Sequence, residues 1–243
     1  MKPPRLRILA GPNGSGKSTL AKQLMSKYAV NLYTFLNSDE LYKEISAKHK
    51  TACPFACEQM TLISFIEKST YPEEYKAPFL NSEIQIKDDD YIYCSPNSIN
   101  SYTSAMIADF FKQEYLRHRV SFSFETVFSH PAKIEILKQA QNSGYRTYMY
   151  FVATETPEIN IERIQLRVKQ HGHNVPADKT RDRFHRCLAQ IKPALPYLNR
   201  AYFFDNTLES TRFLAEYNPE TGLTFYTSDL PLWFTKSVMQ VSG

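Results

Sequence analysis

Hydrophobic and polar residues follow two alternating patterns along most of this chain. Short apolar runs, typical of buried strands, occur at 5–10, 32–37, 120–128, 145–154 and 200–206. Between these runs, apolar residues recur every three or four positions, which predicts helices at 17–28, 39–50, 98–119, 131–144, 157–172 and 176–198. Strands that alternate with helices predict an α/β fold, with a mostly parallel sheet and helices on both faces.

Proline and glycine support several of these boundaries. Two predicted helices begin near a proline and end near a glycine, and Pro193 is expected to kink or end the last one. Beyond it, "RFLAEYN" and "LTFYTSD" predict two short strands.

The segment 51–97 does not keep either period for long. It contains aromatic residues, prolines and the acidic run "KDDD". We expect one phosphate-loop (P-loop) kinase-like domain over 1–243, with 51–97 as an insertion of unknown role. Within the insertion we expect a short helix near 56–68 and a hairpin or loop near 83–95.

The first predicted strand leads into a glycine-rich turn and then a helix. "GPNGSGKS" matches the phosphate-binding pattern G-x-x-x-x-G-K-[ST] in that context. Its N–H groups and the helix N-terminus are expected to face phosphate oxygens. The positive charge of Lys17 would contact the β and γ phosphates, and the hydroxyl of Ser18 would bind Mg²⁺. The predicted phosphate-binding residues are Gly11, Asn13, Gly14, Ser15, Gly16, Lys17, Ser18 and Thr19.

The second predicted strand ends on "LNSDE". Ligands bind at the carboxyl ends of parallel strands, so Asp39 is a candidate general base for an attacking hydroxyl. Asn37, Ser38 and Asp39 are all good helix N-caps, and the residues alone leave both interpretations of Asp39, base or cap, open. A cap supplied by Ser38 would leave the carboxylate of Asp39 for chemistry.

The third strand end carries "FETVFSHP". Glu125 is a candidate for supporting Mg²⁺ through water or for holding the substrate, and Thr126 for binding a substrate hydroxyl. The alternative for Glu125 is a solvated loop residue.

A basic region follows later in the chain, in "ERIQLRVKQHGHNVPADKTRDRFHR". Two predicted helices there present basic faces: Arg163 and Arg167 on the first, and Lys179, Arg183 and Arg186 on the second. Such faces suit a lid over a triphosphate, because positioned arginines stabilise charge on a phosphoryl group in transfer. The alternative is a solvated helix pair with pairs such as Asp182 with Arg186.

Histidines and cysteines do not predict a metal site. His171 and His173 stand two apart on the predicted loop between these helices, where hinge or surface histidines are more usual. Cys53, Cys57, Cys94 and Cys187 lack CxxC spacing, and reduced thiols in a cytoplasmic protein are the expectation.

Composition and charge narrow the class of protein. The chain of 243 residues is 42% hydrophobic and 22% charged, as in globular proteins. A net charge of +4 fits an anionic ligand but is too small to predict a nucleic-acid partner. No apolar run reaches the ~18 residues of a membrane helix, and the N-terminal apolar run is too short for a signal peptide.

Taken together, these motifs resemble the zeta-toxin-like family of P-loop kinases. The likeness rests on "GPNGSGKST", "FLNSDE", "SFSFETVFSHP", "GYRTYMYFVA" and "RVKQHGHNVPADKTRDRFHR", in this order, and covers roughly 5–45 and 98–206. The chain departs from the family in two places. The insertion 51–97 has no counterpart in short members, and "TVFSHP" replaces a loop rich in glycine and arginine.

The resemblance implies a kinase that uses ATP and Mg²⁺ to phosphorylate a hydroxyl of a small molecule. In the best-understood branch that molecule is UDP-N-acetylglucosamine, and the family includes toxins blocked by an antitoxin protein. It also implies residue roles. Asp39 is the base, Lys17 and Ser18 serve the phosphates and metal, Glu125 and Thr126 contact substrate, and Arg167 and Arg183 grip the γ-phosphate. Arg163 and Arg186 match less well.

Two other classes of protein carry the same loop. A transporter-type ATPase would need an LSGGQ-like signature and an apolar strand that ends in Asp-Glu, and the sequence has neither. A nucleotide-binding regulatory module, or an ATPase without small-molecule transfer, stays the alternative to a kinase.

Overall fold

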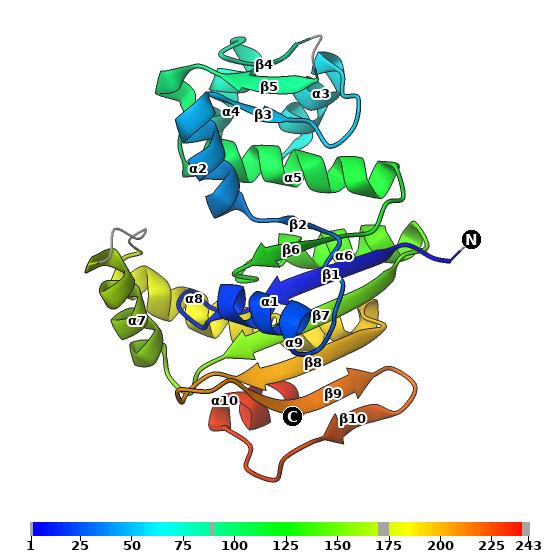
Figure 1. Cartoon of the computed structure of the whole chain (residues 1–243), viewed down its shortest axis with the longest axis vertical. Coiled ribbons are helices and arrows are strands. Elements are labelled where there is room, and N and C mark those ends of the chain that lie inside the picture. Colours follow the sequence, from blue (N-terminus) through cyan, green and yellow to red (C-terminus); the bar gives the residue numbers. More distant parts are fainter. Residues whose placement is uncertain (1, 88–89, 170–174, 240–243) are drawn as a thin grey trace. The chain divides into compact units, whose positions relative to one another are not determined.

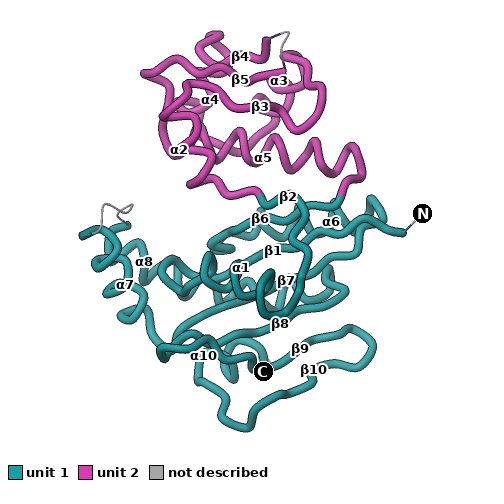
Figure 2. The backbone as a smooth tube through the Cα atoms, viewed as in Figure 1, with its two compact units in different colours: residues 1–35, 121–243 teal, residues 36–120 magenta. Residues whose placement is uncertain are grey.

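The computed structural model describes residues 2–87, 90–169 and 175–239. The chain forms two compact units, residues 1–35 with 121–243 (unit 1) and residues 36–120 (unit 2), coloured separately in Figure 2. The predicted insertion 51–97 lies inside unit 2, which also includes the helices before and after it. That 1–243 acts as one domain stays a prediction.

The main sheet contains seven strands in the described part of the chain, in the order β10-β9-β8-β7-β1-β6-β2 (Figure 1). Their bounds are β1 (Arg5–Ala10), β2 (Thr34–Leu36), β6 (Phe122–Thr126), β7 (Arg146–Ala153), β8 (Arg200–Asp205), β9 (Arg212–Asn218) and β10 (Gly222–Phe225). β1 pairs in parallel with β6 and β7, and β7 pairs in parallel with β8. The last two pairs, β8 with β9 and β9 with β10, are antiparallel.

Helices of unit 1 cover both faces of this sheet (Figure 1). They are α1 (Lys17–Ser26), α6 (Ala132–Asn142), α7 (Pro157–Lys169), α8 (Ala177–Ala189), α9 (Ile191–Ala194) and α10 (Leu232–Phe234), with the turns η2 (Leu195–Tyr197) and η3 (Thr235–Met239). On one face, Leu20 and Leu24 of α1 pack with Leu9 of β1 and Val152 of β7 in one buried cluster. Burial of this apolar surface fixes α1 on the central strands.

The predicted α/β class, with a mostly parallel sheet and helices, is confirmed. β6 is shorter than the predicted run 120–128, because the backbone turns after it: the Thr126 hydroxyl accepts a hydrogen bond from Phe128 N, and Phe128 has φ 59°. The predicted helix 176–198 is broken into α8, α9 and η2, with Pro193 inside α9, as its position suggested. The end of the predicted helix 157–172 lies outside the described residues.

Unit 2 has its own small antiparallel sheet, in the order β3-β5-β4. Its elements are α2 (Ser38–Lys48), β3 (Lys50–Ala52), α3 (Gln59–Lys68), α4 (Glu73–Leu80), β4 (Ile84–Ile86), β5 (Tyr91–Cys94), η1 (Pro96–Ser98) and α5 (Ser101–Arg117). The expected helix and hairpin are present as α3 and β4–β5. α4 and β3 were not predicted. A left-handed residue, His49 with φ 54°, ends α2 earlier than expected and leads into β3.

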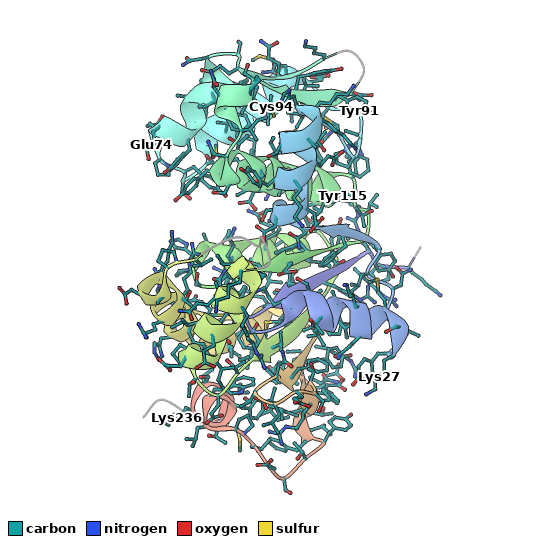
Figure 3. All side chains as sticks on the ribbon, turned by 60° about the vertical axis from the view of Figure 1, so that its left-hand side comes forward. Lys27, Glu74, Tyr91, Cys94, Tyr115 and Lys236 are labelled. Atoms are coloured by element: carbon teal, nitrogen blue, oxygen red, sulfur yellow. The ribbon has the colours of Figure 1, made fainter. Side chains whose placement is uncertain are left out.

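The hydrophobic core of unit 2 is formed by residues from α2, α3, α4, β4, β5 and α5. Ile45 of α2, Phe79 of α4, and Met106 and Phe110 of α5 are all at most 1% exposed and share one cluster. Figure 3 shows the side chains and labels Cys94, which closes the same cluster from β5. In the part of the chain that the structure describes, no helix has the length and apolar character needed to cross a membrane.

Candidate functional site

The loop after β1 has a shape that only glycine permits. Gly11 has φ +153°, and a Cβ there would lie 2.1 Å from the carbonyl oxygen of Val152 in β7. Gly16, with φ +94°, precedes the first residue of α1, and a Cβ there would lie 2.2 Å from Nδ2 of Asn206. A glycine-lined turn at a helix N-terminus forms a cradle of N–H donors for phosphate oxygens.

Lys17 and Ser18 are brought together with Glu125, as the strand-end argument expected. The Lys17 side chain is buried, and its Nζ donates to the carbonyl oxygen of Pro12 at 2.9 Å and lies 3.9 Å from Glu125 Oε1. Ser18 Oγ donates to Glu125 Oε2 at 3.1 Å. The site therefore holds a buried cation, a hydroxyl and a carboxylate beside the phosphate cradle.

Two further polar atoms of the loop are buried. Asn13 Oδ1 and Ser15 Oγ have no hydrogen-bond partner among the described residues. Buried polar atoms normally find a partner, so these two leave room for a polar ligand at the loop. Thr19, the last residue of the predicted set, is exposed on the first turn of α1.

Asn206 was missed from the sequence although it takes part in the loop. It follows β8 directly, and its Nδ2 donates to the carbonyl oxygen of Ser15 at 2.9 Å. Thr211 Oγ1 donates in turn to Asn206 Oδ1 at 3.0 Å, which fixes the orientation of the amide. The rule that selected Glu125, a polar residue just past a parallel strand, would have selected Asn206 as well.

Helix α7 packs directly against the loop. A Cβ at Gly14 would lie 2.6 Å from the carbonyl oxygen of Asn160, so the two backbones touch. Asn160 is fully buried, and its Oδ1 accepts from Thr154 Oγ1 at 2.6 Å. This contact anchors the first half of α7, and therefore the start of the basic region, to the phosphate loop.

The arginines of α7 and α8 have different environments. Arg163 donates through Nη1 to the carbonyl oxygen of Asn206 at 2.7 Å, and so braces the segment after β8. Arg186 forms an intrahelical ion pair with Asp182, as expected for a solvated helix and not for a lid over a triphosphate. Arg167 is exposed on α7 and Arg183 half-buried on α8, so neither is sequestered in the core.

Other contacts join α8 to the rest of unit 1. Arg181 Nε donates to Glu158 Oε1 at 3.1 Å, which ties the first turns of α8 and α7 together. Burial raises the pKa of the Cys187 thiol on α8, and the nearby charge of Lys17 opposes that rise. Lys179 is exposed on the first turn of α8. His171 and His173 lie outside the described residues.

Asp39 lies in unit 2, on the first turn of α2, with an exposed side chain. The N-cap of α2 is Asn37, whose Oδ1 accepts from the backbone N–H of Asp39 at 2.8 Å and of Glu40 at 3.4 Å. Neither Ser38 nor Asp39 is the cap, because the amide of Asn37 already serves the first helical N–H groups. The capping role proposed for Asp39 is therefore wrong, and its role as a base stays a prediction.

Glycine-rich loop, helix and parallel sheet together define a P-loop nucleotide-binding fold. Residues 95–205 match the model of the zeta toxin family. The match supports the resemblance found in the sequence over that segment, which includes Glu125 and the basic helices but not the phosphate loop or Asp39.

Solved structures share the fold. The structure of the PezAT chromosomal toxin–antitoxin system of Streptococcus pneumoniae is 13% identical, with 93% of this chain and 76% of that chain covered and a TM-score of 0.54. The AvrRxo1-ORF1:AvrRxo1-ORF2 structure with ATP is 15% identical, with 99% of this chain and 66% of that chain covered and a TM-score of 0.57. At such identities the likeness establishes the fold.

A curated relative matches only in part. An uncharacterized protein of Haemophilus influenzae is 28% identical over 69 residues, which are 28% of this chain and 49% of that protein. The match thus spans about half the length of that relative.

Proposed function

We propose that this protein is an ATP- and Mg²⁺-dependent phosphotransferase that moves the γ-phosphate to a hydroxyl of a small molecule. The observation that carries the proposal is the cluster of Lys17, Ser18 and Glu125 at the glycine cradle. ATP as the donor is further supported by the AvrRxo1 complex, which was solved with ATP in the same fold.

The phosphate loop would hold the donor. Its N–H groups would bind phosphate oxygens, while Lys17 would exchange its contact with the Pro12 carbonyl for the β and γ phosphates. The buried position of Lys17 strengthens this contact, because charges attract more strongly where water is excluded.

The residues at the loop fit a magnesium ion. Mg²⁺ is usually bound by one or two protein oxygens together with phosphate oxygens and water. Ser18 Oγ and Glu125 Oε2, which lie 3.1 Å apart, supply that kind of set. Among the described residues, no group of three or more histidine, cysteine, aspartate or glutamate side chains offers a self-contained metal site. When bound, the ion would neutralise charge on the phosphates.

The acceptor would be activated by a carboxylate. We assign that role to Asp39, whose side chain is exposed and is not used as a helix cap. Glu125 and Thr126 would contact the acceptor, and Arg167 and Arg183 would stabilise the phosphoryl group during transfer. Following the zeta toxin likeness, we propose a nucleotide sugar such as UDP-N-acetylglucosamine as the acceptor.

A protein partner is part of the proposal. The PezAT structure is that of a toxin–antitoxin system, and AvrRxo1-ORF1 was solved in complex with ORF2. We therefore propose that this chain has an antitoxin that blocks its activity.

The test is transfer of label from γ-labelled ATP, with Mg²⁺, to a panel of UDP-sugars. Labelled UDP-N-acetylglucosamine is expected with the natural chain, and a loss of about 10³-fold or more with Lys17→Ala. Asp39→Asn should lose transfer but keep ATP binding, because the carboxylate acts on the acceptor alone.

Matched controls separate chemistry from folding. Lys22→Ala removes the same kind of charge from an exposed position of α1, five residues after Lys17. Glu40→Gln changes the residue next to Asp39. Glu40 forms an exposed ion pair with Lys43, so its loss should cost little. Both controls should transfer label as the natural chain does. A Lys17→Ala protein with normal transfer would refute the kinase proposal, and ATP binding without any labelled product would favour a regulatory nucleotide-binding module.

A further inference from the structure

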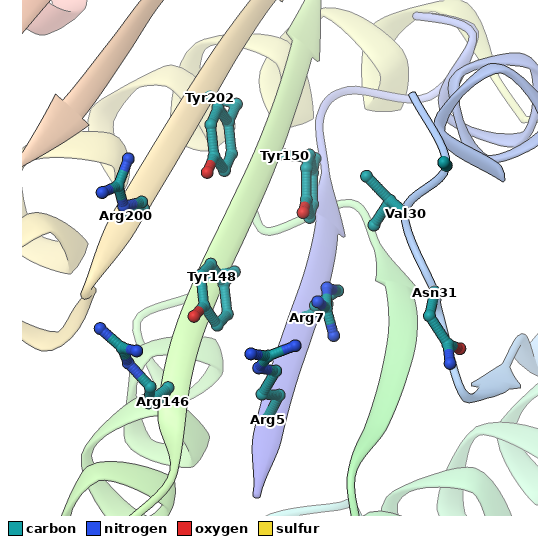
Figure 4. A pocket seen from close by; sticks show the side chains of 10 residues that line it. Arg5, Arg7, Val30, Asn31, Arg146, Tyr148, Tyr150, Arg200 and Tyr202 are labelled. Atoms are coloured by element: carbon teal, nitrogen blue, oxygen red, sulfur yellow. The ribbon is translucent and has the colours of Figure 1, made fainter. Parts of the chain in front are cut away.

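A second polar pocket lies in unit 1, at the opposite end of β1 from the phosphate loop. It has a volume of about 500 Å³, within the range of roughly 300–1,000 Å³ usual for small-molecule sites. Figure 4 shows its lining, which includes Arg5 and Arg7 of β1, Arg146, Tyr148 and Tyr150 of β7, and Arg200 and Tyr202 of β8. Arg7 and Gly11 are four positions apart in the sequence, which is about 13 Å along an extended strand.

The pocket exists because α1 is shorter than the strands it covers. α1 has 10 residues and is therefore about 15 Å long, while β7 has eight residues and spans about 26 Å. The helix covers the strand ends nearest the loop, around Leu9 and Val152. The other half of the same sheet face is left to the polar residues, and Ala29, Val30 and Asn31 after the helix form a wall.

Strand register places like charges side by side in this pocket. Arg5 of β1 is directly beside Arg146 of β7, and the next row on the same face holds Arg7, Tyr148 and Arg200. Like charges opposite one another destabilise a sheet. In the described part of the chain Arg5, Arg7 and Arg146 form no salt bridge, and only Arg200 has a carboxylate partner, Glu216 of β9.

Arg7 is the strongest sign of a ligand. Its side chain is 7% exposed, and its Nε and Nη1 atoms donate no hydrogen bond among the described residues. The rings of Tyr33 and Tyr148, 4.9 and 5.2 Å from the guanidinium carbon, offset part of the cost of burying the charge. The rings accept no hydrogen bond from Nε or Nη1, and buried N–H groups without an acceptor are costly.

The tyrosines add donors to the same space. Burial raises the pKa of Tyr202 to about 12, so its hydroxyl remains protonated at neutral pH. Burial opposes ionisation of Tyr33, but the hydrogen bonds from Arg7 and Arg5 outweigh it and lower the pKa of Tyr33. A group of guanidinium and phenol donors without a matching set of acceptors selects for an anion.

We propose that this pocket binds a small anion with at least two linked phosphate groups. Among the described residues, Arg5, Arg7 and Arg146 have no carboxylate partner, and a diphosphate carries about three negative charges near neutral pH. Arginine forks pair bidentately with phosphate oxygens. The ligand is either a free oligophosphate or the phosphate end of a nucleotide. For a nucleotide, the rest of the pocket volume would hold the nucleoside, beside the stacked rings of Tyr150 and Tyr202.

The experiment measures binding of inorganic pyrophosphate and of ADP by calorimetry, with every variant made in a Lys17→Met background. This background weakens the phosphate loop equally in all samples and makes the result independent of transferase activity. Arg7→Met, and the double variant Arg5→Gln with Arg146→Gln, are each expected to weaken pyrophosphate binding at least about tenfold. Lys22→Gln, which removes an exposed charge from α1, should change it less than about twofold.

Stability of the free protein distinguishes a binding role from a structural one. Without ligand, Arg7→Met should unfold at the same temperature or higher, because an uncompensated buried charge is removed. Pyrophosphate should raise the unfolding temperature of the background protein and not of Arg7→Met. Tighter binding of ADP identifies a nucleotide as the ligand, and equal binding identifies a free oligophosphate.

Three results would overturn the proposal. The first is pyrophosphate affinity that neither pocket variant changes. The second is a large loss of stability in ligand-free Arg7→Met, together with unchanged pyrophosphate affinity in the double variant. In the natural chain Arg146 is exposed, so its replacement should not disturb the fold. The third is tight binding of a single-stranded oligonucleotide with no binding of pyrophosphate or ADP.

Discussion

Gly11 shows how one residue can determine the geometry of the candidate site. The loop must pass so close to β7 that no side chain fits, and the backbone must adopt φ +153°. Gly222, on β10, has φ +76° with open space around its missing Cβ. Both positions have a positive φ, which favours glycine, but they differ in the room available.

That difference leads to a prediction for stability. Gly11→Ala should lower the free energy of unfolding by about 3 kcal/mol or more, because strain and a backbone clash add together. Gly222→Ala should cost only about 1 kcal/mol, since it adds strain alone. Urea unfolding of the two variants measures both values. Equal losses would mean that the loop moves away from β7 at little cost.

At the scale of elements, the N-cap of α2 is the side-chain amide of Asn37 and not Asp39, the proposed general base. Asn37 accepts hydrogen bonds from two backbone N–H groups, while Ser38 is already the first helical residue. Asp39 and Glu40 in the first turn also interact favourably with the helix dipole. The N-terminus of the helix that carries Asp39 is thus stabilised by Asn37, which leaves the carboxylate of Asp39 out of the cap.

The cap can be tested by two adjacent substitutions. Asn37→Ala should destabilise the protein by about 1 kcal/mol, because two N–H groups lose their acceptor. Ser38→Ala should change stability by no more than about 0.5 kcal/mol. Chemical denaturation followed by helical circular dichroism gives both numbers. A larger effect at Ser38 than at Asn37 would contradict the capping described above.

At the scale of the whole molecule, residues 36–120 have the features of a separate folding unit. Their core contains Ile45 from α2, Phe79 from α4 and Phe110 from α5, and these are at most 1% exposed. α2 and α5, which pack against each other, lie outside the predicted insertion 51–97. The segment that looked irregular in the sequence is therefore the middle of a larger compact unit.

Two fragments test this division. A fragment of residues 36–120 should unfold cooperatively, because it contains the complete cluster around Phe79. A fragment of 51–97 should show no such transition, since it lacks the apolar faces of α2 and α5. Thermal and urea unfolding provide the comparison. If 36–120 failed to unfold cooperatively, unit 2 would depend on unit 1 for its fold.

The sequence by itself was enough for features that depend on neighbouring residues. The phosphate loop was predicted from eight contiguous residues, because its conformation depends on its own glycines and the helix that follows. The α/β class and most helices and strands were predicted from local periodicity. Segments with short elements, such as α4 and β3, were missed since a few residues carry too little periodic signal.

Only the tertiary structure decided which distant residues meet. Ser18 contacts Glu125, 107 residues away, because β1 pairs with β6 in a register that no local pattern specifies. The arginines of the second pocket come from three strands, and their convergence depends on the order β8-β7-β1. Strand pairing is determined by burial over the whole chain, and for that reason the sequence named the residues without showing this arrangement.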